Sequence, residues 1–162
     1  MTLSFRAAVL HAPRTPLTVE TITAGPLKPG DVLVRIKAAG LCHTDLEVIE
    51  GSLRYPMPIV LGHEAAGIVE DVGPQVKGVA VGDHVILSWN PHCGTCFYCR
   101  QQQPILCQDY RAHATASLHF DGAPRLFLDD ETVHPLMYAG TFAELAVITE
   151  SCAVVIPRAM PL

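Results

Sequence analysis

Apolar residues fall into short segments along this chain, and glycine and proline residues separate them. In the segment Val32–Ala38, the apolar residues Val32, Val34 and Ile36 recur at every second position, a period that predicts a β-strand with one face in a core. Several short strands of this kind predict a mostly β fold, built as an antiparallel sandwich or a partly open barrel. The predicted strands are Arg6–Leu10, Leu17–Ile22, Val32–Ala38, Ile59–Leu61, Ala65–Val72, His84–Ser88, Phe142–Ile148 and Ala153–Ile156.

Two segments depart from the strand pattern. Thr44–Ile49 is predicted as the one helix of the chain, with Thr44 as its N-cap. The stretch from Pro91 to about Arg111 is rich in Cys, Gln and Pro and is interpreted as a segment that projects from the barrel and contributes no strand to it. No Gly-x-Gly-x-x-Gly motif or phosphate-binding loop occurs, so we expect no Rossmann domain in this chain.

Composition and charge exclude several classes of protein. Of the 162 residues, 49% are hydrophobic, which argues against intrinsic disorder. The formal charge is −5 and no basic cluster occurs, so we expect no nucleic-acid partner. No apolar run reaches the roughly 18 residues of a membrane span, and the N-terminus lacks the features of a signal peptide. We therefore expect a cytoplasmic protein without a membrane partner, in which six cysteines indicate metal binding or catalysis.

Four of the cysteines lie within fifteen positions, at Cys93, Cys96, Cys99 and Cys107. Four thiolates suit a closed tetrahedral zinc site, which stabilises a segment that has little core of its own. An iron–sulfur cluster is the alternative, although the ferredoxin spacing ends in x3-Cys-Pro and the last gap here is seven residues. A redox pair would normally lie in a βαβ unit, which is not predicted here. The alternative without a shared function is that the four cysteines are unrelated and bind no metal.

A second constellation combines Cys42-His43-Thr44-Asp45 with Gly62-His63-Glu64 about twenty residues later. Taken alone, a cysteine at a strand end is usually a small buried residue, and a single histidine is more often structural than a metal ligand. The pair His63-Glu64 does not belong to a zincin helix, because position 67 is Gly67. Beside a four-cysteine cluster, the two motifs suggest a second metal site.

Together these motifs resemble the medium-chain, zinc-dependent alcohol dehydrogenases. The match runs from about Arg6 to Ile156, and the order and spacing of its motifs agree throughout. The resemblance implies that residues 1–162 form a GroES-like catalytic domain, with a zinc lobe at about 91–111. The matching motifs are Gly40–Asp45, Gly62–Gly73, Gly82–Val85 and the four-cysteine cluster.

The resemblance also implies a set of metal-site residues. Cys42 and His63 match two protein ligands of a catalytic zinc, and Glu64 matches a neighbouring carboxylate that can approach the metal. Asp45 matches the carboxylate that orients the ligand histidine. The four-cysteine cluster matches the structural zinc site. The family's third zinc-ligating cysteine lies beyond the aligned region, and Cys152 reads as a core residue instead.

Five further positions are implied by the resemblance. Thr44 matches the hydroxyl that accepts the alcohol proton, and His43 matches a position that faces the cofactor pyrophosphate. Some relatives pass the proton onward through a histidine where this chain has Glu47, a carboxylate that could act through water. Trp89 and Leu53 fall where the family lines its substrate pocket, although Trp89 could equally pack in the core.

The implied activity is NAD(P)-linked oxidation of an alcohol to an aldehyde or ketone, through a zinc-bound alkoxide and hydride transfer. Its partner would be a small-molecule alcohol or aldehyde, and the complete enzyme would be a homo-oligomer. Because no nucleotide-binding domain is predicted within these residues, we expect the chain alone to have no turnover. The alternative function is a zinc-stapled binding or structural module with a vestigial catalytic site.

Overall fold

The computed structural model describes residues 2–116 and 118–162. Within these described residues, ten strands and three α-helices form the framework, with four one-turn 3-10 helices between them. The strands are β1 (Leu3–Leu10), β2 (Thr18–Ala24), β3 (Asp31–Ala39), β4 (Ile59–Val60), β5 (Ala65–Val72), β6 (His84–Leu87), β7 (Leu126–Leu128), β8 (Glu131–Pro135), β9 (Leu145–Thr149) and β10 (Ala153–Ile156). The helices are α1 (His43–Glu50), α2 (Phe97–Arg100) and α3 (Gln108–His113), with η1 (Pro104–Leu106), η2 (Ala114–Ala116), η3 (Leu136–Tyr138) and η4 (Glu150–Cys152).

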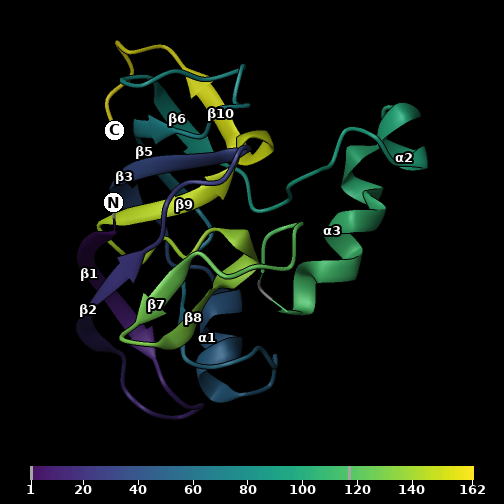
Figure 1. The fold of residues 1–162 in the computed structure, drawn as a ribbon. Helices are drawn as coiled ribbons and strands as arrows, with labels where there is room; N and C mark the ends of the chain where they lie inside the picture. The colour runs from purple at the N-terminus through teal and green to yellow at the C-terminus, as the bar shows by residue number, and fades with distance from the viewer. Residues whose placement is uncertain (1, 117) are drawn as a thin grey trace.

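Five strands close into a barrel in the order β1-β2-β7-β8-β4. The pairing is antiparallel except between β4 and β8, which run parallel. The other five strands form a second sheet in the order β10-β6-β5-β3-β9, and all of its pairs are antiparallel. The two sheets lie against each other, and α1 lies at the end of the barrel (Figure 1).

The segment that precedes β9 ties the two sheets together. Ala143 forms an isolated bridge with Ala7 of β1, and the amide of Ala8 donates to the carbonyl of Phe142 over 2.8 Å. On the other side, the amide of Ile36 in β3 donates to the carbonyl of Glu144 over 3.0 Å. One short stretch therefore hydrogen-bonds to a strand of each sheet.

Three apolar clusters hold the fold, and alternating strand residues supply most of their members. The first fills the barrel, the second lies behind the other sheet and includes the buried thiol of Cys152, and the third lies beneath α1. The cluster beneath α1 joins the barrel end to the helix through Leu10, Val48, Ile59, Leu61 and Leu136, all fully buried. Burying each such side chain contributes about 1.5–3 kcal/mol.

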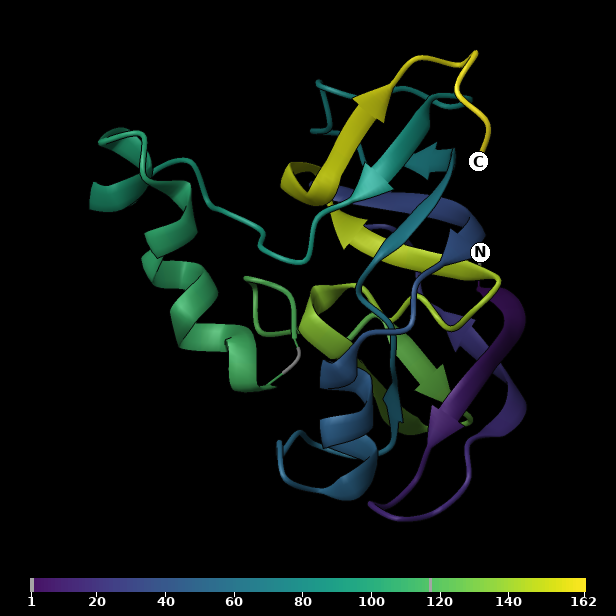
Figure 2. The same cartoon turned by 180° about the vertical axis from the view of Figure 1, so that it is seen from behind.

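The four-cysteine segment projects from the barrel as a separate lobe, which contains α2, η1, α3 and η2 (Figures 1 and 2). Neither α2 nor α3 buries a residue, and Phe97, Ile105 and Leu106 expose apolar side chains. One contact to the barrel comes from Tyr138, whose hydroxyl donates to the carbonyl of Tyr110 over 3.2 Å.

The predicted mostly β fold with a barrel, a lobe and short helices is confirmed, and the barrel, which was expected to be partly open, is closed. Strands Ala65–Val72 and Ala153–Ile156 have the predicted bounds. Of the short helices, the sequence pattern located only α1, and it missed α2 and α3 in the lobe. Thr44 was also wrong as the N-cap: Cys42 takes that place with an extended backbone, so Thr44 lies inside the helix. No helix among the described residues has the length and apolarity needed to cross a membrane.

Candidate metal centres

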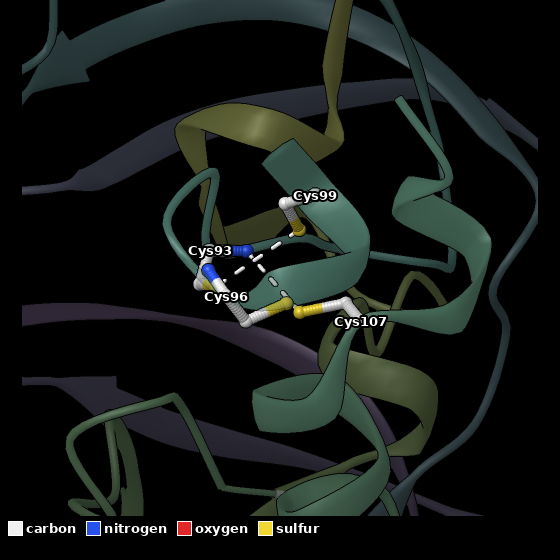
Figure 3. A group of neighbouring side chains, drawn as sticks. All are labelled: Cys93, Cys96, Cys99 and Cys107. Carbon is white, nitrogen blue, oxygen red and sulfur yellow. Dashed lines mark hydrogen bonds between the residues drawn. The ribbon is translucent and has the colours of Figure 1, made fainter. Parts of the chain in front are cut away.

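The four cysteines of the lobe turn their sulfur atoms toward one another (Figure 3). All four Sγ atoms lie within 4.8 Å of one another, and none forms a disulfide. Cys93 comes from the extended segment after β6, Cys96 caps α2, Cys99 lies within α2, and Cys107 caps α3. The lobe therefore folds around the four thiols.

Backbone amides point at the sulfur atoms of this cluster. The amide of Cys96 donates to Cys93 Sγ over 3.3 Å, and the amide of Cys93 donates to Cys107 Sγ over 3.4 Å. Amides of Cys99 and Gln108 lower the pKa of the Cys96 thiol to about 6, whereas desolvation and the neighbouring thiols raise the pKa of Cys99 to about 12. Amide donors stabilise thiolates, and a divalent cation would relieve the crowding of negative charge that opposes further ionisation.

A second group forms where α1 meets β5. Ligand atoms of Cys42, His63 and Glu64 lie within 4.8 Å of one another. Cys42 stands at the N-cap of α1, and His63 and Glu64 precede β5 directly. The His63 side chain is buried and Glu64 is exposed, so the group has one wall in the core and one side toward solvent.

Asp45 holds the residues of this group in position from the buried side. Its fully buried carboxylate accepts from the amide of Cys42 over 2.9 Å and from the amide of Gly62 over 2.8 Å. The same carboxylate lies 3.5 Å from Nδ1 of His63. With Nδ1 directed at Asp45, the nitrogen left to face a ligand is Nε2. Asp45 thus holds both chain segments and orients the imidazole, as expected of a carboxylate behind a metal-ligating histidine.

The charges of these groups support one another. Burial opposes ionisation of Asp45, but the nearby His63 imidazole and the hydrogen bonds from the amides of Cys42 and Gly62 prevail and lower its pKa. The Asp45 carboxylate raises the pKa of His63, against the effect of burial. The backbone and hydroxyl of Thr44, followed by His63, lower the pKa of Cys42. The local field therefore favours a thiolate at Cys42, the form that binds metal.

Two glycines that the sequence motifs contain acquire a physical role here. At Gly40, an added Cβ would come within 2.7 Å of Glu64 Oε2, so the glycine makes room for that carboxylate. Gly62 has a φ of +85°, and an added Cβ would meet the Thr141 hydroxyl and come within 2.6 Å of the Phe142 ring. Sequence reasoning did not single out Thr141 or Phe142, because both are distant in the chain.

The remaining predicted site residues lie at differing distances from the second group. The Thr44 hydroxyl lies 3.7 Å from Cys42 Sγ and is half-buried. His43 is exposed in the first turn of α1. The Glu47 side chain is half-buried in the same helix, and its backbone carbonyl accepts from the amides of Ser52 and Leu53. Its part in a proton relay stays a prediction.

The two predicted substrate-pocket residues occupy different surroundings. Leu53 lines a cavity of about 440 Å³ beside the C-terminal end of α1. Trp89 is 41% exposed, and its ring centroid lies 6.5 Å from that of Tyr110 in the lobe. Because Ala65 pairs with Leu87, the continuation of β6 carries Trp89 toward the level of His63. Their role in holding a substrate stays a prediction.

The donor sets of both groups fit zinc. Four thiol sulfurs suit a closed structural site, and one sulfur, one imidazole nitrogen and one carboxylate oxygen suit a site with an open position. Calcium and magnesium prefer oxygen ligands and fit neither group. The barrel and these two groups form a β domain with two candidate metal sites, a four-thiol group in the lobe and an open group on the barrel.

Comparison with known families identifies this domain more closely. The family model of the alcohol dehydrogenase GroES-like domain matches residues 28–158, and the chain belongs to this family. An NDMA-dependent alcohol dehydrogenase of Amycolatopsis methanolica is 40% identical over 157 residues, which cover 97% of this chain and 42% of that protein. The chain thus spans less than half the length of this relative.

Solved structures agree with this assignment. The chain superposes on an alcohol dehydrogenase zinc-binding domain protein of Burkholderia ambifaria with a TM-score of 0.92 and 37% identity, over 100% of this chain and 44% of the other. It superposes on the benzyl alcohol dehydrogenase of Acinetobacter calcoaceticus with a TM-score of 0.88 and 31% identity, over 98% of this chain and 42% of the other. The predicted resemblance to alcohol dehydrogenases is confirmed.

Proposed function

We propose that this chain is the catalytic domain of a zinc-dependent alcohol dehydrogenase. In the complete enzyme it would serve NAD(P)-linked oxidation of a small-molecule alcohol to an aldehyde or ketone. The observation that carries the proposal is the convergence of Cys42, His63 and Glu64, with Asp45 behind them, in a member of this family. A purely structural barrel would have no use for this donor set.

Cys42, His63 and Glu64 would hold the catalytic zinc, and the four lobe cysteines would hold a structural zinc. When bound at the open centre, zinc supplies Lewis-acid polarisation of the alcohol oxygen. Asp45 keeps the His63 ring in one tautomer and orientation through Nδ1. The core beneath α1 and the bonds of Asp45 to two amides hold the ligands in position without help from the metal.

In this proposal, Thr44 would accept the alcohol proton. Its hydroxyl lies beside Cys42 Sγ and can accept a hydrogen bond from a substrate hydroxyl that approaches the open centre. Oxidation also releases a hydride from the carbinol carbon, and this hydride needs a nicotinamide as acceptor. Binding that cofactor requires a nucleotide-binding domain, with His43 contributing from this side. We therefore expect the 162-residue chain by itself to show no turnover with NAD(P).

Cobalt substitution tests the proposal on this chain directly. Loading with Co²⁺ should give visible d–d bands from both centres, and a primary alcohol such as benzyl alcohol should shift the bands of the open centre alone. The Cys42→Ser chain should lose the alcohol response and keep the bands of the lobe. If no d–d band of the unsubstituted chain shifts when alcohol is added, the proposal is contradicted and a binding or structural module is favoured.

A further inference from the structure

An aromatic contact joins the four-cysteine lobe to the segment that follows β6. The ring centroid of Tyr110, in the first turn of α3, lies 6.5 Å from that of Trp89, a separation within the range of aromatic pairs. Because Ala65 pairs with Leu87 in the antiparallel register, the continuation of β6 brings Trp89 to the level of His63. The contact therefore leads from one candidate metal group toward the other.

The position of Tyr110 within the lobe depends on the four thiols. Cys107, the buried member of the four-thiol group, is the N-cap of α3, and its carbonyl accepts from the amide of Arg111 over 3.2 Å. The helix has six residues and buries none of them, and an isolated helix shorter than about 12 residues is marginal in water. The order of α3, and with it the place of Tyr110, therefore follows from how firmly the thiols are held together.

Tyr138 of the barrel supports Tyr110 from the other side. The two ring centroids lie 5.6 Å apart, and the Tyr138 hydroxyl donates to the carbonyl of Tyr110 over 3.2 Å. Tyr138 is fully buried, and its φ of +62° directly follows a φ of +48° at Met137. Two successive non-glycine residues keep this left-handed conformation only where the surrounding packing enforces it. The barrel thus offers a fixed aromatic surface for the first turn of α3.

Trp89 has little besides Tyr110 to hold its ring. The side chain is 41% exposed, and among the residues that the structure describes its one aromatic pair is with Tyr110. The backbone beside it is anchored, because the amide of Ser88 donates to the carbonyl of Cys152 over 2.8 Å. Loss of the ring contact would therefore free the indole without detaching the strand that carries it.

We infer that Tyr110 is a positioning residue, through which metal binding in the lobe fixes the conformation of Trp89. When the four thiols are held together, α3 is ordered and its tyrosine ring confines the indole. When they are not, α3 has no buried residue to hold it, and the indole is free to turn toward solvent. Because Trp89 stands at the level of His63, the state of the lobe reaches the open group on the barrel. This coupling does not depend on the reaction that the open group supports.

Trp89 is the only tryptophan of the chain, so tryptophan fluorescence reports its environment alone. Two variants separate the metal groups, because Cys42→Ser leaves the four thiols intact and Cys107→Ser leaves the open group intact. Zinc added to metal-free Cys42→Ser should shift the emission to shorter wavelength and lower the acrylamide quenching constant at least about twofold. The same addition to Cys107→Ser should change neither quantity. An unchanged emission in Cys42→Ser, or a larger response in Cys107→Ser, would overturn the proposal.

Substitutions of lobe tyrosines assign the effect to Tyr110. Tyr110→Leu should keep the lobe zinc but leave Trp89 as strongly quenched as in the metal-free chain. Tyr110→Phe should restore the protection, because it keeps the ring and the backbone carbonyl that Tyr138 contacts. Tyr98→Leu is the matched control, since the Tyr98 ring pairs with Phe97 over 5.4 Å, and it should leave Trp89 protected.

Three results with these variants would overturn the positioning role of Tyr110. Equal quenching of Trp89 in Tyr110→Leu and Tyr98→Leu would show that the ring contact does not hold the indole. Failure of Tyr110→Phe to restore protection would show that the aromatic ring is not what acts. Loss of the lobe zinc in Tyr110→Leu, measured by elemental analysis, would make the ring a structural part of the lobe instead.

Discussion

At the scale of single residues, Gly62 connects Asp45 to the segment that precedes β9. Its amide donates to Asp45, and its carbonyl accepts from the amide of Thr141 over 3.0 Å. A Gly62→Ala substitution would place a side chain at a φ of +85° and against the Phe142 ring. Because the left-handed conformation and overpacking each cost about 1–3 kcal/mol, we expect a loss of roughly 3 kcal/mol in the free energy of unfolding.

Gly122→Ala supplies the matched control for this prediction. Gly122 also has a positive φ, +69°, but an added Cβ there meets nothing within 4 Å. Urea unfolding should therefore show a loss of only about 1 kcal/mol in this chain, the cost of the backbone conformation alone. Equal losses of unfolding free energy in the two chains would mean that the Thr141–Phe142 segment moves to accommodate the added side chain at little cost. Gly62 would then not fix the position of the site.

His119 is a residue whose ionisation should affect stability. It is 2% exposed, and neither ring nitrogen has a hydrogen-bond partner within the described structure. Burial, together with the Arg125 guanidinium, lowers its pKa to about 4, although Asp31 and Asp121 act in the opposite direction. Arg125 itself is tied to Asp31 and Asp121 by hydrogen bonds of 2.5 to 3.2 Å.

The sign of the resulting pH dependence follows from the proton balance. Between pH 6.5 and about 4 the unfolded chain carries a proton on His119 and the folded chain does not. Acidification through this window should therefore cost folding stability, by up to roughly 3 kcal/mol, and the cost should level off below pH 4. Chemical unfolding at a series of pH values measures it. His119→Gln should flatten the dependence of stability on pH in this window. Both chains have the same metal ligands, so an equal slope in the two chains would mean that groups other than His119 cause the pH dependence.

At the scale of elements, we expect the lobe to depend on bound metal for its structure. Its helices α2 and α3 bury no residue, so no apolar core replaces a bound ion. Cys96→Ser should remove one zinc per chain and expose residues 91–116 to proteases, while the barrel resists. Limited proteolysis followed by mass spectrometry locates the cuts.

Cys152→Ser is the control for that experiment. Cys152 is a buried thiol of the apolar cluster behind the second sheet, and it lies in neither candidate metal group. This chain should keep its zinc and its resistant lobe. Equal resistance of the lobe in Cys96→Ser would contradict the dependence on metal.

The elements also show how far the sequence alone predicts the fold. Strands with clear apolar segments, such as Ala65–Val72, were predicted with the observed bounds. β7 and β8 were missed, because each is short and the charged pair Asp129-Asp130 separates them. α2 and α3 were missed for a different reason: helices that bury no residue carry no apolar periodicity, and their positions follow from the cysteines.

The candidate site divides in the same way. The four-cysteine site was predicted from the spacing of its thiols, whereas the ligand roles of Cys42, His63 and Glu64 were predicted from the resemblance to the alcohol dehydrogenases. The roles of Gly40 and Gly62 were not, because they depend on close approach to Glu64, Thr141 and Phe142 in three dimensions. Likewise, sequence spacing does not show that Leu53 lines a cavity.

At the scale of the whole molecule, two metal groups stand on one β framework. One lies in a lobe whose helices bury no residue, and the other lies where α1 and β5 are already held by Asp45 and by the core beneath α1. The relatives compared above are more than twice as long as this chain, which covers 42% to 44% of each. The domain therefore carries the candidate metal ligands, and we expect the nicotinamide chemistry of the proposed enzyme to require more than these residues.

Zinc content per chain, measured by elemental analysis of protein purified without added metal, tests the central claim most directly. We predict two zinc ions in the unsubstituted chain, one in Cys107→Ser and one in Cys42→Ser, the ion lost in each case being that of the substituted group. A single zinc that Cys42→Ser leaves in place would contradict the assignment of a catalytic metal to Cys42, His63 and Glu64, and iron in the lobe would contradict its assignment as a zinc site.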